Sequence, residues 1–579
     1  MTSKLEEYKK GKKPTQSTNR LWPLYGAGLE NLGVNDQPID VPMPIYGPDE
    51  LLVRHDACGL CFSDVKVIRL GQEHPRIHDR DVKKDPITLG HEVSMTVVGV
   101  GAKLKDQFKP GDRFILQADI FMNGVGYAYG YMIQGGLSQY NVLDQRILNG
   151  DDGNYLIPIN PNTGYAESAI VEPWACVIAA YHLKYRTELK AGGTAWFIGP
   201  EADRQYTISK GFNLDLHPGR IILTQMDGKF GQWLRSKAKE LGIQIEERNN
   251  LNDLPNEPDE TQKIDDIIVL QPDANLIEKV SPLLGIHAIL AICSPRRLDR
   301  KLKIDVGRVH YDRWVYIGGS DPDISKVYSH MPVRSSLKAG GKVLFIGAGG
   351  PMGRMHVQHA IEVSNGPTTI ICSDVSDLRL EDLRASFEKE AKEKGKEFIC
   401  LNPTQKAEYS ARIAPFQSSG FDDVVVLAPI PAVISEAATH LANQGVMNIF
   451  AGVGRGTFAD LDLNDTLLRD TRVIGHSASS IEDMRTMLDQ VERGELSTNR
   501  SVAAIGSLEA VKDGMNALMD ASYPGKVVIF PHIRSLALTS VPDLKNVLPD
   551  VYAKLKDGRE WTKEAEETLL NTMLDLGEE

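Results

Sequence analysis

The sequence predicts an α/β protein in which a β-rich domain is followed by two doubly wound parallel-sheet domains in tandem. Between residues 50 and 140, short apolar runs alternate with Gly and Pro, which is typical of short strands joined by turns. From residue 189 onward, apolar strand-like runs alternate with helical stretches, which is typical of a parallel sheet covered by helices. One eleven-residue segment occurs twice in this second part, which indicates two similar repeats.

The repeated segment fixes the offset between the two repeats. Leu189–Gly199 and Leu337–Gly347 are identical at eight of eleven positions, at an offset of 148 residues. The ends of the repeats are also similar, since Val315–Ser320 resembles Arg472–Ser477. We therefore expect the first part of a β-rich domain at 1–188, a first repeat at 189–336, a second repeat at 337–480, a return to the first domain at 481–534 and a helical tail at 535–579.

Local patterns add detail at the ends of the first domain. Residues 1–50 are polar and then Pro-rich, so we expect no clear helix there. Residues 165–187 have a helical apolar period, and residues 562–576 of the charged tail do as well. We expect helices over both of these ranges.

Composition limits the classes of function. The chain has 579 residues, too many for a single core, and a formal net charge of −13, which argues against a general nucleic-acid-binding protein. The Lys-rich start is not followed by an apolar segment, and no apolar run is long enough to span a bilayer. Six cysteines are too few for a disulfide framework in so long a chain. We therefore expect a cytoplasmic protein with no membrane or nucleic-acid partner.

A candidate catalytic metal site lies in the first domain. Cys61 supplies a thiolate, His91 an imidazole and Glu92 a carboxylate. This is the ligand set of a catalytic zinc that keeps one coordination position open. Glu172 is a fourth candidate ligand, and a nearby acid such as Asp64 is needed to hold the histidine tautomer.

A dinucleotide site is predicted in the second repeat. Such a site needs glycines after the first strand, because the backbone must turn tightly and approach a pyrophosphate at a helix N-terminus. Asp374, after the next strand, can accept hydrogen bonds from the adenosine ribose, which favours NAD(H), although Arg379 nearby leaves NADP(H) open. The other candidate binding residues are Gly347, Gly349, Gly350, Pro351, Met352 and Gly353.

The first repeat lacks the features of a dinucleotide site. Gly199 is followed by Pro200–Arg204, which contains no glycine and has two acids where phosphate would bind. After the second strand of this repeat, no acid occurs before Asp227. We therefore predict that the first repeat does not bind a dinucleotide and serves as a scaffold.

The motifs resemble those of the zinc-dependent medium-chain dehydrogenases and reductases, in particular the sorbitol dehydrogenase and L-sorbose-1-phosphate reductase branch. The similar pieces are Gly59–Asp64, Gly90–Glu92, Glu172-Pro173 and the Gly-rich loop after residue 346. The resemblance implies a GroES-like β-barrel catalytic domain and two tandem Rossmann-like domains, where the family normally has one. It also implies one catalytic zinc per chain, and the absence of cysteine between Cys61 and Cys176 implies no structural zinc.

The resemblance also implies roles for single residues. Ser63 would be a proton-relay hydroxyl bonded to the substrate oxygen, and Asp64 would orient the zinc-bound histidine. Lys66 stands where many family members have the histidine at the solvent end of the relay. In this branch Glu92 and Glu172 exchange as ligands during turnover, so either is expected to bind zinc at rest.

The loop between residues 64 and 90 is long for the family. Its cations could bind a phosphorylated substrate, but its four acids favour a solvated loop. The cations are Arg76, His78, Arg80, Lys83 and Lys84, and the acids are Glu73, Asp79, Asp81 and Asp85.

The predicted function is hydride transfer between NAD(H) and a small-molecule polyol, a ketose or one of their phosphates. The alternatives are a simple alcohol or amino-alcohol dehydrogenase and a non-catalytic NAD(H)-binding scaffold, which the repeat allows. Subunits of the family pair through the edge strands of their cofactor domains. We therefore expect either a homodimer or an intrachain pseudo-dimer of the two repeats.

Overall fold

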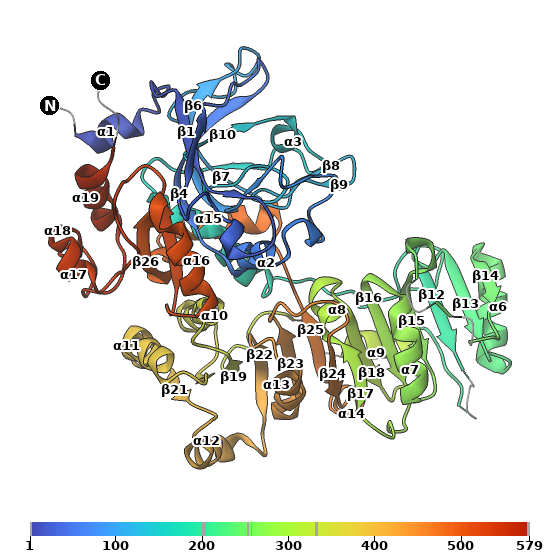
Figure 1. Cartoon of the computed structure of the whole chain (residues 1–579). Helices are drawn as coiled ribbons and strands as arrows, with labels where there is room; N and C mark the ends of the chain where they lie inside the picture. The colour runs from blue at the N-terminus through green and yellow to red at the C-terminus, as the bar shows by residue number, and fades with distance from the viewer. Residues whose placement is uncertain (1–2, 200–203, 252–253, 256–257, 331–333, 576–579) are drawn as a thin grey trace. The chain divides into compact units, whose positions relative to one another are not determined.

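A computed structural model describes residues 3–199, 204–251, 254–255, 258–330 and 334–575 of the chain (Figure 1). The chain forms two compact units. The first unit comprises residues 1–179, 350–355 and 478–579, and the second comprises residues 180–349 and 356–477. The α/β class predicted from the sequence is confirmed, with an N-terminal sheet of mainly antiparallel strands and a mainly parallel sheet further along the chain.

The first unit is built on an eight-stranded sheet. Its strand order is β11-β7-β6-β4-β27-β26-β28, and β10 pairs with β4. The two longest strands, β4 and β6, are antiparallel and place Gly59 opposite Glu92. The strands are β4 (Leu51–Gly59), β6 (Glu92–Val100), β7 (Arg113–Leu116), β10 (Tyr140–Leu143), β11 (Leu156–Pro158), β26 (Val502–Ser507), β27 (Lys526–Phe530) and β28 (Thr539–Ser540).

The C-terminal part of the chain returns to this sheet. Strand β27 pairs antiparallel with β4, so Val528 lies opposite Gly59 at the end of β4. Helix α19 (Lys563–Met573) begins after its N-cap Thr562, close to the helix that the sequence predicts over 562–576. Its Glu566 accepts the backbone N–H groups of Tyr165 and Ala166 at 2.6 and 2.8 Å, which ties the tail into the first unit.

Two predictions at the ends of the first domain are wrong. Residues 1–50 contain a short helix, α1 (Lys4–Lys9), which buries Leu5 and Tyr8 and is too short for a helical period to be visible in the sequence. The helix predicted over 165–187 is two helices, α4 (Tyr165–Ala169) and α5 (Val171–Ala179). Beyond Ala179 the chain is not helical, and the apolar residues there, such as Tyr181, are buried without forming a helix.

The second unit contains one continuous sheet of twelve strands. One half has the order β14-β13-β12-β15-β16-β18, and the other, from the opposite edge, has the order β21-β20-β19-β22-β23-β25. All pairs within each half are parallel. The strands of the first half are β12 (Thr194–Ile198), β13 (Arg220–Thr224), β14 (Gln244–Glu247), β15 (Ile264–Val269), β16 (Leu284–Cys293) and β18 (Val315–Gly319). Those of the second are β19 (Lys342–Ile346), β20 (Thr369–Ser373), β21 (Glu397–Leu401), β22 (Phe421–Val426), β23 (Leu441–Ile449) and β25 (Arg472–Gly475).

The two halves therefore have the same strand order, numbered 3-2-1-4-5-6 within each repeat. They meet where β18 and β25 run antiparallel, with Tyr316 opposite Val473 (Figure 1). These two strands are the segments whose similarity marks the ends of the repeats in the sequence. The edge-to-edge pairing that an intrachain pseudo-dimer requires is thus present within one chain.

The repeats also share a buried ion pair beside their first strands. Arg186, just before the first repeat, has its Nη1 3.0 Å from both carboxylate oxygens of Asp266. Arg334, just before the second repeat, donates to Asp423 Oδ1, and the two arginines are separated by the offset of the repeated segment. Both acids also accept a backbone N–H from the start of that segment. Each acid is almost fully buried, so each depends on its arginine for charge compensation.

One apolar core lies across both repeats. It includes Trp196 and Tyr316 from the first repeat together with Leu344 and Val473 from the second. Strands β17 (Leu302–Asp305) and β24 (Phe458–Leu461), one from each repeat, pair antiparallel and contribute their apolar side chains to the same core. The repeats therefore stabilise each other by burial as well as by strand pairing.

Two smaller expectations concern cysteines and membranes. The six cysteines are all free thiols, as expected for a chain without a disulfide framework. In the described part of the chain, none of the helices has both the length and the apolar character that crossing a bilayer requires.

We predict that Arg186→Gln and Arg334→Gln destabilise the protein to a similar extent, by about 3 kcal/mol each, because each leaves a buried aspartate without its cation. Chemical denaturation followed by circular dichroism measures this. The control is Lys389→Gln, because Lys389 and Glu393 form an exposed pair at 4.0 Å that should contribute little. Unequal losses at the two arginines would contradict the equivalence of the two ion pairs.

Candidate metal and cofactor sites

Cys61 lies at the junction of a strand and a helix. It follows β4 and is the N-cap of α2 (Phe62–Leu70). Asp64, at the third position of that helix, accepts the backbone N–H of Cys61 at 2.9 Å. This capping contact fixes the backbone that carries the thiol.

His91 and Glu92 come from the other strand of the central pair. Glu92 is the first residue of β6, and His91 directly precedes it. Gly90 has φ +98°, and a Cβ atom there would lie only 2.7 Å from Cys58 Sγ. A glycine is therefore needed for the turn that presents His91.

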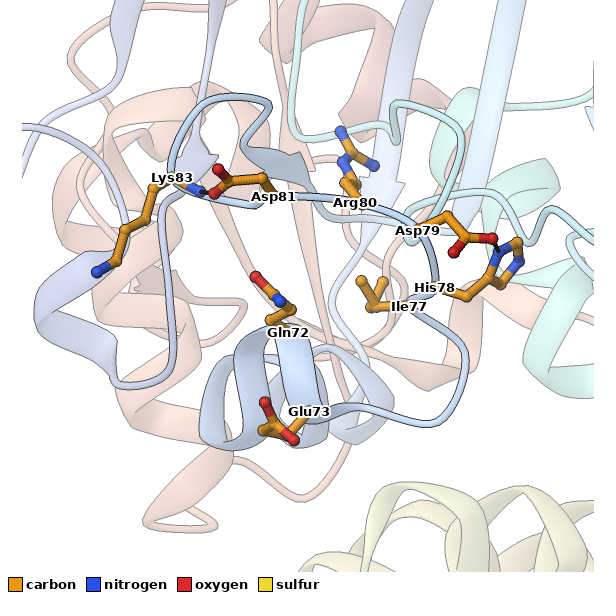
Figure 2. A pocket seen from close by; sticks show the side chains of 8 residues that line it. All are labelled: Gln72, Glu73, Ile77, His78, Asp79, Arg80, Asp81 and Lys83. Atoms are coloured by element: carbon orange, nitrogen blue, oxygen red, sulfur yellow. Dashed lines mark hydrogen bonds and ion pairs between the residues drawn. The ribbon is translucent and has the colours of Figure 1, made fainter.

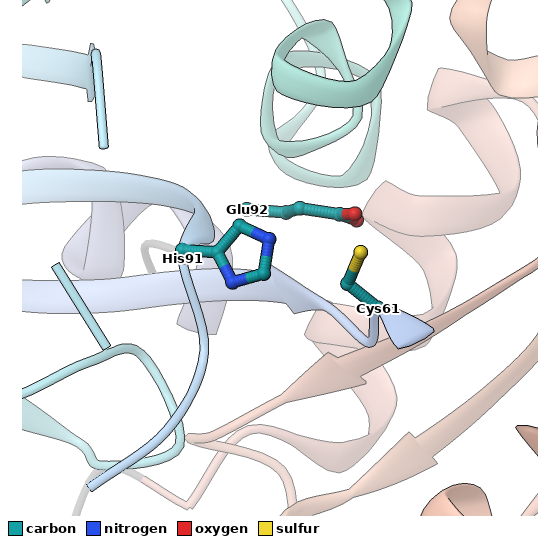
Figure 3. Close-up of side chains that lie close together, drawn as sticks. All are labelled: Cys61, His91 and Glu92. Carbon is teal, nitrogen blue, oxygen red and sulfur yellow. The ribbon is translucent and has the colours of Figure 1, made fainter. Parts of the chain in front are cut away.

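The three candidate ligands converge (Figure 3). The thiol of Cys61, one ring nitrogen of His91 and one carboxylate oxygen of Glu92 lie within 4.8 Å of one another. No further group of three such side chains is found in the described ranges. His91 and Glu92 are buried, and Cys61 is half-buried. Glu92 Oε2 is also buried without a hydrogen-bond partner, so a cation at this position would relieve a costly desolvation. The donor set suits zinc.

Asp64 lies where an acid that orients the histidine is needed. Its Oδ1 is 3.4 Å from His91 Nδ1 and accepts the backbone N–H of Gly90 at 3.3 Å. Burial alone would lower the pKa of His91, but the charges of Asp64 and Cys61 raise it well above its usual value. Asp64 therefore contacts both segments that carry candidate ligands.

Lys526 is a site residue that the sequence analysis missed. Its Nζ lies 2.5 Å from Glu92 Oε1, and both side chains are almost fully buried. Burial alone would lower the pKa of Lys526, but Glu92 raises it above its usual value. A charged residue at the start of the otherwise apolar strand β27 is the signal that could have indicated this role. The lysine occupies one oxygen of Glu92, and the unpartnered oxygen is the one left for a metal.

Glu172 is near this centre but is not one of the three clustered ligands. It lies in α5, and burial raises its pKa to about 7, with Glu92 adding to the effect and His91 and Lys526 opposing it. Its Oε1 is 3.9 Å from the thiol of Cys176, one helical turn further along. Cys176 is a second residue near the centre to which the sequence analysis gave no role. The arrangement therefore places Glu92 rather than Glu172 beside Cys61 and His91.

Ser63 and Lys66 lie on α2, directly after Cys61. Ser63 is in the first turn of the helix, Lys66 follows three residues later, and both are half-buried. They share a helix with the residue that supplies the thiolate, as a proton relay beside the metal requires. Their catalytic roles stay predictions.

The second repeat has the strand–loop–helix context that the glycine motif needs. β19 ends at Ile346, and Gly347 follows with φ +83°, in the region that favours glycine. The N–H of Gly349 donates to Asp374 Oδ2 at 2.9 Å, and a Cβ at Gly349 would lie 2.5 Å from that of Arg379. Gly350 then leads into α10 (Pro351–Glu362), whose first residues are Pro351, Met352 and Gly353. Dinucleotide binding by these residues stays a prediction.

The corresponding position of the first repeat differs. Pro200–Asp203, on which the prediction of no dinucleotide binding partly rests, lie outside the described residues. Gln225 follows β13 as Asp374 follows β20, so this repeat lacks the acid that would bind the ribose.

The loop between α2 and β6 borders an open hollow (Figure 2). Most cations of this loop are bound within the protein. Arg80 donates to the carbonyl oxygens of Tyr131 and Pro86 at 2.9 and 2.8 Å. His78 Nε2 lies 2.9 Å from the Gly126 carbonyl oxygen, and the exposed Lys84 pairs with Asp81. Two of the cations that line this hollow, His78 and Arg80, therefore have structural partners.

Known proteins resemble the chain over different extents. Residues 47–149 match the alcohol dehydrogenase GroES-like domain family. The chain is 22% identical to mannitol-1-phosphate 5-dehydrogenase of Aliivibrio fischeri over 539 residues, covering 91% of this chain and 93% of that protein. It is 25% identical to L-sorbose 1-phosphate reductase of Klebsiella pneumoniae, over 48% of this chain and 71% of that protein. It is 44% identical to sorbitol dehydrogenase of Gallus gallus, over 14% of this chain and 21% of that protein.

We predict that Glu172→Gln stabilises the metal-free protein at about pH 8 by about 2 kcal/mol but not at about pH 5. The pKa of Glu172 is raised in the folded protein, so its favourable neutral form is present below the ordinary value of 4.5 and is lost as the pH rises through about 7. Only above that range does the substitution remove a buried charge. Thermal unfolding of chelator-treated protein measures the effect, with the exposed Glu73→Gln as the control. An equal effect at both pH values would contradict this explanation.

Proposed function

We propose that this chain, a member of the medium-chain dehydrogenase/reductase family, is a zinc-dependent oxidoreductase that transfers a hydride between NAD(H) and a polyol, a ketose or one of their phosphates. The convergence of Cys61, His91 and Glu92 is the observation that carries the proposal. The names of the relatives, which are dehydrogenases or reductases of polyols and sugar phosphates, support this substrate class.

Cys61, His91 and Glu92 would hold the metal, and Glu172 would replace Glu92 or bind through water. When bound, zinc polarises a substrate carbonyl or lowers the pKa of a substrate alcohol, and NAD(H) exchanges the hydride. Lys526 contributes by compensating the charge of Glu92 at its second oxygen. This pairing limits the negative charge that thiolate and carboxylates would otherwise accumulate in a buried site.

The protein's own acid–base groups would handle the proton. Asp64 Oδ1, 3.4 Å from His91 Nδ1, would favour a proton on that nitrogen and so leave Nε2 to bind a metal. Ser63 would hydrogen-bond to the substrate oxygen and take its proton in the oxidation direction. Lys66, one turn further along α2, is the candidate for passing that proton to solvent.

The second repeat would bind the dinucleotide, with the glycines after β19 against the pyrophosphate and Asp374 at the adenosine ribose. The first repeat would act as a scaffold that pairs with the edge strand β25. The pairing of β18 with β25 supports an intrachain pseudo-dimer.

We predict that Cys61→Ser loses bound zinc and at least a hundredfold in activity, about 3 kcal/mol of transition-state stabilisation. The measurement is NADH formation from NAD⁺ with D-sorbitol, D-mannitol and their phosphates, with and without 1,10-phenanthroline, beside the metal content of each protein. Cys400→Ser, a buried cysteine in β21, is the control and should keep zinc and activity.

Three outcomes would redirect the proposal. Zinc-containing protein that oxidises simple or amino alcohols but no polyol would favour the alcohol dehydrogenase alternative. Protein that binds NADH but contains no zinc and has no activity would favour the scaffold alternative. Turnover that the chelator leaves unchanged would contradict a zinc-dependent reaction.

A further inference from the structure

Arg76 differs from the other cations of its loop because it lies toward the candidate metal centre. Its guanidinium carbon is 5.4 Å from the ring centre of Tyr131. The same ring is 6.0 Å from the ring of His91. The guanidinium carbon of Arg76 is therefore at most about 11 Å from the His91 ring, the sum of these two separations.

A carboxylate holds Arg76 in this position. Arg76 Nη2 lies 2.6 Å from Asp119 Oδ1. Asp119 is itself close to the centre, since its charge contributes to the raised pKa values of Glu172 and Cys176. The Arg76 side chain is still 44% exposed, and a guanidinium carries five N–H donors, so one ion pair leaves donors for an anion.

Lys66 and His74 complete the surroundings of Arg76, since Lys66 adds a positive charge and His74 adds a ring N–H donor. The His74 ring lies 5.4 Å from the Tyr131 ring, on the same short stretch of loop as Arg76. Burial, together with the charges of Arg76 and Lys66, lowers the pKa of His74 to about 4. His74 is thus a neutral imidazole near neutral pH, and its ring N–H can donate a hydrogen bond to an anion.

We propose that Arg76 and His74, in the field of Lys66, form an anion subsite that binds the phosphate of a phosphorylated polyol or ketose. The inference rests on the proposed function and narrows its substrate class to phosphorylated compounds. Tyr131 would form the wall between the subsite and the metal centre, and Asp119 would position the guanidinium. Arginine suits this role because its planar N–H donors match two phosphate oxygens at once.

The distances fit a sugar phosphate. With bonds near 1.5 Å, an extended chain advances about 1.3 Å per bond. A substrate oxygen at the metal and a phosphorus atom on the far end of a six-carbon chain are separated by seven bonds, or about 9 Å. A phosphate on the neighbouring carbon is separated by four bonds, or about 5 Å. The guanidinium carbon of Arg76 is at most about 11 Å from the His91 ring, so a phosphate on the far end of the chain, with one hydrogen bond added, can reach it.

The test compares matched substrates in the full-length, zinc-containing protein. The pairs are D-mannitol with D-mannitol 1-phosphate and L-sorbose with L-sorbose 1-phosphate. The readout is kcat/KM for the phosphorylated compound divided by kcat/KM for its partner. We expect this ratio to be far above one in the unmodified protein and to fall roughly tenfold to a hundredfold in Arg76→Gln, the loss of a charged hydrogen bond. Arg76→Lys, which keeps the positive charge, should have a ratio between those of Arg76→Gln and the unmodified protein.

Two controls separate this effect from damage to the fold or the metal site. Lys84→Gln removes a charge from the same loop, where Lys84 is 86% exposed and pairs with Asp81, and should leave the ratio unchanged. Zinc content is measured in every variant and should stay at the unmodified level in Arg76→Gln. Inorganic phosphate should inhibit the unmodified protein competitively and Arg76→Gln more weakly.

The outcomes distinguish this inference from the proposed function. A ratio near one in the unmodified protein, or a ratio that Arg76→Gln leaves unchanged, would overturn the phosphate subsite and leave the polyol dehydrogenase proposal standing. An equal fall of the ratio in Lys84→Gln would show a general effect of loop charge and would also overturn it. Zinc-containing protein that uses neither member of any pair would overturn both.

Discussion

Asp64 joins the two segments on which the candidate metal centre depends. Its two oxygens accept the N–H of Cys61 on one side and that of Gly90 on the other, beside the ring of His91. One buried carboxylate thus holds the thiolate segment and the turn before β6, and it lies 3.4 Å from the imidazole of His91. The antiparallel pairing of β4 with β6 then places Glu92 next to the same thiol. Strand pairing and helix capping together position the three candidate ligands.

Charge balance is the second constraint on the centre. Burial raises the pKa of Glu172 to about 7, and the negative charges of Glu92 and Asp119 add to the effect. Lys526 compensates one of these charges permanently, and the Oε2 of Glu92 remains without a donor. A divalent cation would complete the balance. Charge balance also bears on Arg76, which Asp119 holds beside the metal centre and not inside it. A cation in that position can attract an anionic substrate without binding the carboxylates and thiolate that would hold the metal.

Sequence reasoning anticipated which side chains and strands lie together where short motifs or a repeated segment carry the information. Cys61, Asp64 and His91 occur in local motifs whose spacing reflects one strand end and one turn, and the repeated segment indicated the two halves of the sheet. Sequence reasoning failed where the two residues in contact are far apart in the sequence, or where a helix is short. Lys526 is 434 residues from Glu92, so no local pattern connects them. The contacts of Arg76 with Asp119 and Tyr131 depend on how a long loop folds back, and helix α1 is shorter than two helical periods.

The pairing of the two halves of the sheet explains why the fold requires the first repeat, although this repeat lacks the acid that would bind a ribose. Strand β25 would be an unpaired edge without β18, and exposed edges invite association with other chains. The apolar core is also shared, since Trp196 and Tyr316 of the first repeat pack in the same cluster as Leu344 and Val473 of the second. Loss of the first repeat would expose both the edge and half of this core. Burial and strand pairing alone would therefore maintain the first repeat, whether or not it binds a ligand.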